Sequence, residues 1–313
     1  MTVSETTTPT STSPSTPAPR WNVGENRRPA DGLHPHSQEA ERSESSQRSQ
    51  EPSPRLRADA VSLAYGERIV VDGVTLDVPT GRITVVVGPN GCGKSTLLRG
   101  LGRLLKPRGG SVLLDGEVIT ELPTREVARR LGLLPQQPIV PEGVSVLELV
   151  ERGRHPHHGL FRSWGRADEE AVASALTRTD LVELASVPVD SLSGGQRQRV
   201  WLAMVLAQDT PVLLLDEPTS FLDIAHQLDV LDLVRSLRDQ SGTTVVMVLH
   251  DLAMAARYAD HLVAMSDGRI IAEGPPAQVV TPEVIADVFG VTASVIVDPE
   301  SGTPLVIPRR RAS

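Results

Sequence analysis

A glycine-rich run in the first third of the chain has the residue types needed to bind phosphate. Residues 88–95 read Gly-Pro-Asn-Gly-Cys-Gly-Lys-Ser, which fits the pattern of glycine, any four residues, glycine, lysine, and serine or threonine. Glycines let backbone N–H groups converge on an anion, and the N-terminus of a following helix adds partial positive charge. We expect Lys94 to contact the β and γ phosphates of a nucleotide and Ser95 to ligate Mg²⁺. The predicted nucleotide contacts of this run are Gly88, Pro89, Asn90, Gly91, Cys92, Gly93, Lys94, Ser95 and Thr96.

A second run supplies two adjacent carboxylates. The apolar residues 212–215 are followed by Asp216 and Glu217. Because side chains alternate along a strand, we expect the two carboxylates to point to different sides and to take different roles. One can hold Mg²⁺, through water, while the other polarises an attacking water molecule. A strand ending in Asp-Glu is common in structural roles, but together with the glycine-rich run it predicts a nucleotide hydrolase.

A third run precedes another helical pattern and forms a second candidate anion site. Residues 192–196 read Leu-Ser-Gly-Gly-Gln, so that Ser193 can cap the helix while Gly194 and Gly195 expose N–H groups at its N-terminus. This run resembles the signature of ATP-binding cassette (ABC) ATPases. The resemblance implies a head-to-tail homodimer, in which each ATP lies between the Gly88 loop of one subunit and the Ser193 loop of the other. It adds Ser193, Gly194, Gly195 and Gln196 to the predicted nucleotide contacts.

Further positions are similar to the functional residues of the same family. Tyr65 resembles the aromatic residue that stacks on adenine, although aromatic residues also favour strands for packing reasons. Gln136 resembles the glutamine that contacts Mg²⁺ and the attacking water, and the adjacent Gln137 leaves its register open. Asp223 resembles the aspartate of a loop that communicates across the dimer, and both Tyr65 and Asp223 are included among the predicted nucleotide-binding residues. In that loop Phe221 replaces the small residue that the family commonly has.

The resemblance also assigns the chemical roles. Glu217 is similar to the general base, and His250 is similar to a histidine that contacts the γ-phosphate, although a single histidine is often structural. The predicted catalytic residues are Glu217, His250 and Gln136, and the predicted metal ligands are Ser95, Gln136 and Asp216. The implied cofactors are ATP and Mg²⁺.

The elements that must hold these residues follow from apolar periodicity. The continuous apolar runs 83–87, 212–215 and 244–249 are typical of buried parallel strands. The alternating runs 61–65, 69–71 and 74–78 predict antiparallel strands, and Asp115-Gly116 predicts a hairpin between 112–114 and 118–119. Helices are expected over the following ranges: 95–105, 167–177, 196–207 and 224–239.

These elements predict an α/β fold, and the resemblance makes it a RecA-like P-loop ATPase core with an antiparallel β subdomain and an inserted α-helical subdomain. Residues 1–55 are rich in serine, threonine and proline and predict a disordered tail. We expect an ABC ATPase domain over 56–290, with the helical insert at about 138–189, and a C-terminal segment over 291–313.

The amino-acid composition narrows the class of protein further. The chain has 313 residues, a formal charge of −8, eight aromatic residues of the Phe, Trp and Tyr types and one cysteine, Cys92. The acidic balance and the few aromatic residues argue against nucleic acid as a partner. A single cysteine favours a reducing compartment. We find neither a signal-peptide pattern nor an apolar run of the roughly 20 residues that cross a bilayer, and so expect that the chain does not span a membrane.

Several phrases are similar to those of ATPases from iron-siderophore uptake systems. They occupy the ranges 153–157, 190–199, 222–227, 249–252 and 298–308. The similarity implies an ATP-hydrolysing importer subunit, peripheral at the cytoplasmic face of the cell membrane, that works with integral membrane permease subunits and indirectly with a substrate-binding lipoprotein. The alternatives are the same role for haem or cobalamin, or a nontransport ABC ATPase.

Two further segments invite interpretation. The histidines 155, 157 and 158 are a poor metal site because Pro156 breaks helical spacing and no carboxylate or cysteine adjoins them. We instead expect the segment after Gln136, through Phe161 and Trp164, to receive the membrane subunit. Cys92 is either a neutral small residue or a reactive thiol, with a pKa lowered by the helix N-terminus and Lys94.

Overall fold

A six-stranded, mostly parallel sheet forms the centre of the fold. The computed structural model describes residues 54–136, 142–158 and 164–311. The strand order is β10-β9-β3-β8-β7-β6, with β10 alone antiparallel to its neighbour. Every residue of β3, β7 and β8 is buried, as expected for strands covered on both faces. The bounds are β3 Ile83–Val87, β6 Leu131–Leu134, β7 Val212–Asp216, β8 Thr244–Val248, β9 His261–Ser266 and β10 Arg269–Gly274.

A smaller antiparallel sheet packs with α2 (Lys94–Leu101) into a second hydrophobic cluster. Its order is β2-β1-β4-β5, and Asp115-Gly116 forms the predicted hairpin turn. The two runs predicted at 69–71 and 74–78 form one strand, because a bulge at left-handed Gly73 keeps the ladder continuous. The bounds are β1 Leu56–Tyr65, β2 Arg68–Val78, β4 Gly109–Leu114 and β5 Glu117–Val118.

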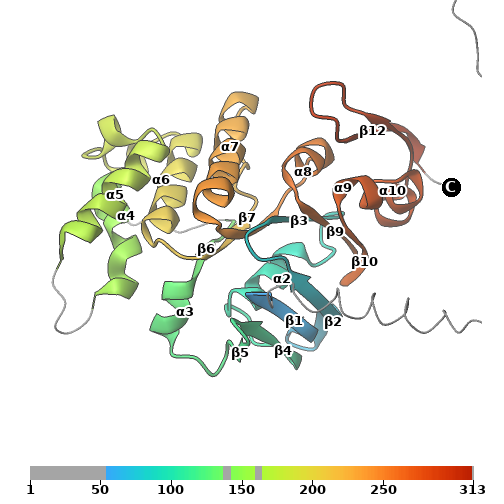
Figure 1. Ribbon diagram of the computed structural model, residues 1–313, viewed down its shortest axis with the longest axis horizontal. Helices are drawn as coiled ribbons and strands as arrows, with labels where there is room; N and C mark the ends of the chain where they lie inside the picture. The colour runs from blue at the N-terminus through green and yellow to red at the C-terminus, as the bar shows by residue number, and fades with distance from the viewer. Residues whose placement is uncertain (1–53, 137–141, 159–163, 312–313) are drawn as a thin grey trace, which may run out of the picture. The chain divides into compact units, whose positions relative to one another are not determined.

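A helical layer lies to one side of the central sheet (Figure 1). It contains α4 (Val146–Glu151), α5 (Arg166–Arg178) and α6 (Gly194–Ala207), with three short 3₁₀ turns among them. The helices α7 (Ile224–Ser241) and α8 (Leu252–Tyr258) follow β7 and β8, and α3 (Thr124–Arg130) precedes β6. The predicted helices 167–177, 196–207 and 224–239 are thereby confirmed to within two residues at either end.

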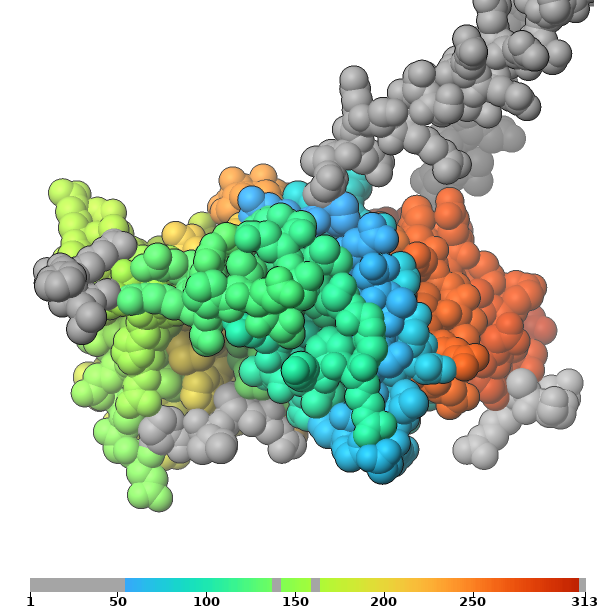
Figure 2. Space-filling model, turned by 90° about the horizontal axis from the view of Figure 1, so that it is seen from below, coloured from blue at the N-terminus to red at the C-terminus, as the bar shows by residue number. Residues whose placement is uncertain are grey.

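The C-terminal elements cover the opposite end of the central sheet. They are α9 (Pro276–Val279), α10 (Pro282–Phe289) and the hairpin of β11 (Val291–Val297) with β12 (Pro304–Arg311). Val295 and Val306 of the hairpin pack against the main hydrophobic cluster. Figure 2 shows the antiparallel-sheet side of the fold, with the helical layer and the C-terminal elements on either flank.

The predicted α/β class is confirmed, and one predicted helix is wrong in length. Helix α2 ends at Leu101 instead of residue 105, because Gly102 caps it and Arg103 turns left-handed at φ 61°. Leu104, which lies inside the predicted helix range but beyond the end of α2, is therefore 62% exposed. The predicted tail up to residue 53 lies outside the described residues, and the predicted domain boundaries stay predictions. In the described ranges, we find no helix that is both long and apolar enough to cross a membrane.

A buried ion pair joins α5 to the rest of the helical layer. Arg154 Nε donates to Asp168 Oδ1 at 2.9 Å, and Arg154 Nη1 donates to the carbonyl of Ala207 at 2.8 Å. The two charged side chains are only 5% and 0% exposed. Removing one partner of such a pair leaves the other charge buried without compensation.

We expect Asp168→Ala to lower the free energy of unfolding by about 3 kcal/mol, measured by urea denaturation at neutral pH. Glu170→Ala is the matched control, because it breaks an exposed ion pair with Arg166. The Arg166 side chain is 89% exposed and the Glu170 side chain is 63% exposed. The control should cost less than about 1 kcal/mol. Equal losses in the two variants would contradict a special role for the buried pair.

The same pair makes stability depend on pH in a defined direction. Burial alone would raise the pKa of Asp168, but hydrogen bonds from Arg154 and from the backbone N–H of Gly165 outweigh burial and lower the pKa. A carboxyl with a lowered pKa in the folded state stabilises the fold above its ordinary pKa, and the contribution is lost as pH falls through the lowered value. Wild type should therefore lose stability relative to Asp168→Ala as the pH falls below about 4.

Candidate functional site

The glycine-rich run forms a tight loop between the end of β3 and the start of α2. A Cβ on Gly88 would come within 2.2 Å of the Met265 carbonyl oxygen, so only glycine fits there. Gly93 is the N-cap of α2, with φ 110° and no side-chain cap. The first N–H groups of α2 are thus free of a competing side chain and can bind an anion.

Lys94 lies inside this loop. Its Nζ donates to the carbonyl oxygens of Gly88 and Pro89, each at 2.9 Å, and the residue is 5% exposed. The ammonium group is therefore held where the loop N–H groups converge. This arrangement places a full positive charge beside the free end of α2, as the binding of phosphates requires.

Ser95 and Asp216 face each other beside the loop. Ser95 Oγ donates to Asp216 Oδ1 at 2.8 Å, and Asp216 is 2% exposed. Burial raises the pKa of Asp216, and the neighbouring charge of Glu217 adds to the rise, while the Ser95 hydrogen bond opposes it. One hydroxyl and one carboxylate are hard oxygen donors, and such a small set fits Mg²⁺, which keeps water and phosphate oxygens as its other ligands.

Glu217 points to a different side from Asp216, as predicted, but the alternation of side chains along a strand is not the cause. Strand β7 ends at Asp216, and Glu217 has left-handed backbone at φ 53°, so a local turn sets its direction. Its Oε1 lies 2.6 Å from His250 Nε2, and its Oε2 accepts from Ser220 Oγ at 3.0 Å. Gln136 also donates to this carboxylate. The structure thus brings the three predicted catalytic residues together.

The environment of Glu217 keeps it ionised. Burial alone would raise the pKa of Glu217, but the hydrogen bonds from His250, Gln136 and Ser220 outweigh burial and lower the pKa. An ionised carboxylate at neutral pH can accept a proton from water. His250 is predicted to contact the γ-phosphate. In this structure, its imidazole contacts the Glu217 carboxylate.

The predicted residues converge on one pocket of about 520 Å³. Tyr65 forms part of its wall, 46% exposed, and its hydroxyl accepts from Arg99 Nη1 at 3.0 Å. An exposed ring at the edge of the pocket is available for a base to stack on. Twelve residues line the pocket, and ten of them are predicted site residues: Tyr65, Asn90, Gly91, Gly93, Lys94, Ser95, Thr96, Gln136, Glu217 and His250.

The second predicted anion site lies elsewhere in the same chain. Ser193 caps α6 by accepting from the Gln196 N–H at 3.2 Å, and Gly194 and Gly195 begin the helix, as predicted. Asp223 caps α7. Together with Ser193, Gly194 and Gly195 it lines a second pocket of about 470 Å³. The two pockets have no lining residue in common. One chain therefore holds two separate half-sites.

Cys92 corrects one hypothesis. The thiol is 5% exposed, and its Sγ would lie 2.8 Å from a Cβ on Gly88. Burial raises the pKa of the Cys92 thiol and outweighs the opposing effect of Lys94. The expectation of a lowered pKa is wrong, because the side chain points into the packed support of the loop. Burial and the raised pKa favour the neutral small residue over the reactive thiol.

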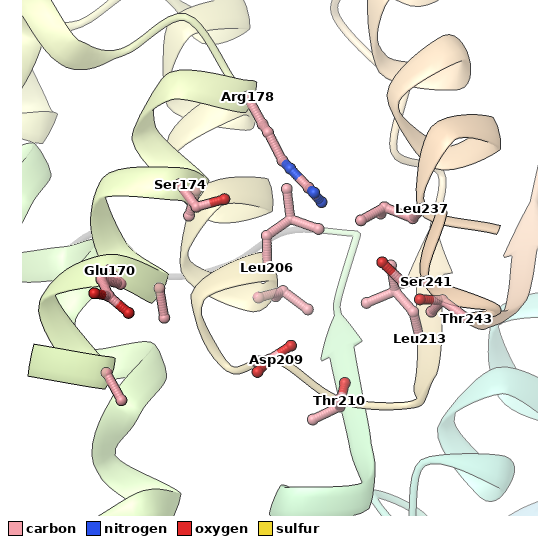
Figure 3. Close-up of a pocket in the computed structure, with 14 residues that line it drawn as sticks. Glu170, Ser174, Arg178, Leu206, Asp209, Thr210, Leu213, Leu237, Ser241 and Thr243 are labelled. Atoms are coloured by element: carbon pink, nitrogen blue, oxygen red, sulfur yellow. The ribbon is translucent and has the colours of Figure 1, made fainter. Parts of the chain in front are cut away.

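Two other features gather none of the predicted site residues. A pocket of about 430 Å³ lies between α5, α6 and the end of α7, with Arg178 reaching into it from α5 (Figure 3). The histidine run is spread over separate contacts: His157 Nε2 lies 2.7 Å from the Gln208 carbonyl, while His158 stacks on Trp164. Among the residues that the structure describes, no three His, Cys, Asp or Glu side chains cluster to hold a metal.

Sequence reasoning missed residues that support the site from outside the motifs. The hairpin of β9 and β10 closes under the phosphate loop, where the Gly268 N–H donates to the Cys92 carbonyl at 2.9 Å. Asp267-Gly268 is the same turn signal as Asp115-Gly116 and could have revealed this hairpin. Ser220 and Gln198 hold the Glu217 turn, and no local pattern marks either residue. Gln137 and Phe161 lie outside the described residues.

Comparison with known proteins agrees with this geometry. The family described as "ABC transporter" matches residues 71–220. A relative from Bacillus subtilis (strain 168), named "Probable siderophore transport system ATP-binding protein", is 53% identical and the match covers 82% of this chain and 93% of the relative. The ferric enterobactin transport ATP-binding protein of Escherichia coli (strain K12) is 51% identical, with 83% and 96% covered.

Solved structures show the same fold. A dimeric structure of a bacterial ABC transporter cassette is similar at a TM-score of 0.64 and 30% identity, covering 70% of this chain and 98% of that one. Together the pocket, the signature helix and these matches place the chain in the ATP-binding cassette family of ABC transporters. It is a nucleotide-binding ATPase of that family.

Proposed function

We propose that this chain hydrolyses ATP in a composite site and thereby powers import of iron-siderophore complexes across the cytoplasmic membrane. The observation that carries the proposal is the carboxylate of Glu217, held by His250, Gln136 and Ser220 at the edge of the phosphate-loop pocket. This arrangement supports a general base aimed at water beside a bound γ-phosphate.

In the proposed mechanism, residues of this chain position the phosphates and the attacking water and neutralise phosphate charge. The free N–H groups of the loop and of α2 bind the phosphates, and Lys94 leaves its loop carbonyls to neutralise the charge that grows on the γ-phosphate oxygens. Glu217 orients the attacking water and accepts its proton, while His250 and Gln136 hold the carboxylate in place. When bound, Mg²⁺ would be held by Ser95 and Asp216, with Gln136 in the same pocket as the third predicted ligand, and would neutralise phosphate charge.

The second half-site supplies the rest of the active site in a dimer. The N-terminus of α6 carries exposed Gly194 and partly exposed Gly195 next to Ser193, but its pocket contains no phosphate loop. A head-to-tail pair of subunits would bring this end of α6 to the nucleotide on the other subunit and form two equal sites about a two-fold axis. The dimeric cassette among the similar structures supports this arrangement.

The cargo and the membrane partners follow from the relatives. The two relatives above are named for siderophore and ferric enterobactin transport, which supports ferric siderophores over haem or cobalamin. We place the subunit at the cytoplasmic face of the membrane, peripherally bound to integral permease subunits that receive cargo from a substrate-binding lipoprotein.

A surface on α4 and the turn after it suits the permease. A hollow of about 350 Å³ is lined by both acidic and basic side chains, and Trp164 at its wall is 40% exposed. The indole stacks on His158 with ring centroids 5.3 Å apart. An exposed aromatic residue among charges suits a docking site. This supports the prediction that the segment ending at Trp164 receives the membrane subunit.

The test is uptake of labelled ferric siderophore and, in parallel, labelled cobalamin and haem, in cells that lack the gene. Complementation by wild type but not by Glu217→Gln should restore ferric siderophore uptake. Restoration of cobalamin or haem uptake alone would reassign the cargo. Normal uptake of all three in the deleted cells, with ATPase activity in the purified protein, would favour a nontransport ATPase.

A further inference from the structure

We propose that Arg99 positions Tyr65 at the edge of the nucleotide pocket and thereby fixes the distance between the base and the phosphates of a bound nucleotide. The inference rests on the nucleotide site proposed above and concerns an arginine that the mechanism does not use. Arg99 Nη1 donates to the Tyr65 hydroxyl at 3.0 Å. Arg99 is a positioning residue, because it does not itself line the pocket that Tyr65 borders.

The Tyr65 ring has little other support. Tyr65 is the last residue of β1, beside the turn that leads into β2, and it is 46% exposed. In the part of the chain that the structure describes, the residue belongs to neither hydrophobic cluster, and Arg99 is the one hydrogen-bond partner of its hydroxyl. An exposed side chain can change rotamer unless a neighbour holds it. Holding the ring in advance reduces the entropy lost when a base stacks on it.

Arg99 belongs to the helix that begins at the phosphate loop. Lys94 and Ser95 form the first turn of α2, and Arg99 lies in its last turn, about 7.5 Å further along the helix axis. One helix therefore carries the residues expected to bind the phosphates and the arginine that holds the ring for the base. The length of α2 between these residues sets how far apart the two ends of the nucleotide can be bound.

Close packing of α2 on β1 keeps Arg99 within reach of Tyr65. A Cβ on Gly100, the next residue of the helix, would lie 2.5 Å from Leu63 Cδ1, so glycine allows the two elements to approach closely. Leu63 is fully buried and lies two residues before Tyr65 on β1. The helix is thus fixed against the same strand that carries the ring, and the hydrogen bond spans a short and defined gap.

Arg99 carries a positive charge as well as a hydrogen-bond donor, and these two properties have different consequences. Burial raises the pKa of Asp216, and the charge of Arg99 acts against that rise, so this charge is felt at the predicted metal-binding end of the site. Loss of the charge would weaken the binding of any polyphosphate. Loss of the positioning would weaken only ligands that carry a base.

The experiment measures, by isothermal titration calorimetry, the affinity of each variant for ATP and for inorganic tripolyphosphate, which has no base. Arg99→Ala should weaken ATP binding by about threefold to tenfold, the effect of freeing one side chain, and tripolyphosphate binding by less than about twofold. Tyr65→Phe removes the hydroxyl without changing the charge and should weaken ATP binding by the same factor. The double variant should lose no more than either single variant, because both changes remove the same hydrogen bond.

Steady-state hydrolysis gives a second measurement. Arg99→Ala should raise KM for ATP with little change in kcat, because the arginine acts on binding and does not touch the reacting atoms. Arg108→Ala is the matched control. Arg108 Nη2 donates to Glu67 Oε1 at 2.9 Å in the turn after Tyr65, and Arg108 does not line the pocket. This control should behave as wild type, and circular dichroism confirms that each variant is folded.

Tyr65→Ala distinguishes the inference from the site on which it rests. It should weaken ATP binding by about tenfold or more, as loss of base stacking does. If Tyr65→Ala weakens binding while Arg99→Ala and Tyr65→Phe do not, the inference is wrong and the nucleotide site stands. If Tyr65→Ala leaves ATP binding unchanged, the predicted stacking contact and the inference fail together.

Two other results would overturn the positioning role. Equal losses for ATP and tripolyphosphate in Arg99→Ala would show that the arginine acts through its charge. Losses that add in the double variant of Arg99→Ala and Tyr65→Phe would show that the two side chains act independently.

Discussion

Glu217→Gln is expected to lower kcat for ATP hydrolysis by about 10³-fold, within the range that loss of a general base causes. The amide has the shape of the carboxylate and can keep a hydrogen bond from Ser220, but it cannot accept a proton from water. ATP binding should persist, because the phosphate loop, Lys94 and Tyr65 are untouched. The measurement is phosphate release at saturating ATP, together with the affinity for a fluorescent ATP analogue.

Glu183→Gln is the matched control for this substitution. Glu183 is an exposed glutamate in a short 3₁₀ turn and lines neither half-site. The control should hydrolyse ATP at the rate of wild type. Hydrolysis by Glu217→Gln within a few-fold of wild type would refute the assignment and direct attention to another base in the pocket.

Lys94→Ala is expected to weaken ATP binding by about 10²-fold and to abolish measurable hydrolysis at millimolar ATP. The substitution removes the only full positive charge inside the loop. It also leaves the Gly88 and Pro89 carbonyl oxygens without the donor that they have in this structure. The affinity is measured by isothermal titration calorimetry with ATP.

The chain offers a natural control, since its only other lysine is Lys106. Lys106→Ala should bind and hydrolyse ATP normally, because Lys106 does not line the pocket. An unchanged affinity in Lys94→Ala would show that the loop N–H groups alone hold the phosphates. If hydrolysis were lost while the affinity stayed unchanged, the lysine would act at a later stage of the reaction.

Residue types and spacing predict this site well because its contacts are local. The phosphate loop lies between one strand and the next helix, so residues 88–95 carry nearly all the information that places it. The same holds for Ser193 at the start of α6. The parallel runs 83–87, 212–215 and 244–249 are likewise visible, because both faces of these strands are buried and nearly every residue is apolar, with Thr84 and Thr244 as the exceptions.

The remainder depends on contacts between distant segments. Strand β6 has four residues with glycine among them, too few for a clear period, and its pairing with β7 comes from tertiary structure. The direction of Glu217 depends on a left-handed turn fixed by Gln198, on a helix well before it in the chain. The raised pKa of Cys92 is caused by burial, which the sequence does not reveal. The neighbouring Lys94, which the sequence does reveal, has the opposite effect and lowers the pKa.

Gly88 has a consequence for the interpretation of mutational scans. A side chain at this position would collide with the Met265 carbonyl oxygen, which is part of the protein's own packing, so substitutions there are expected to damage folding and binding at once. Their loss of function says little about what the phosphates require. Gly91 differs, because a Cβ built there meets no atom within 4 Å. Its φ of 79° still strains any other residue, but asparagine tolerates that region best, which makes Gly91→Asn the more informative probe of the anion contact.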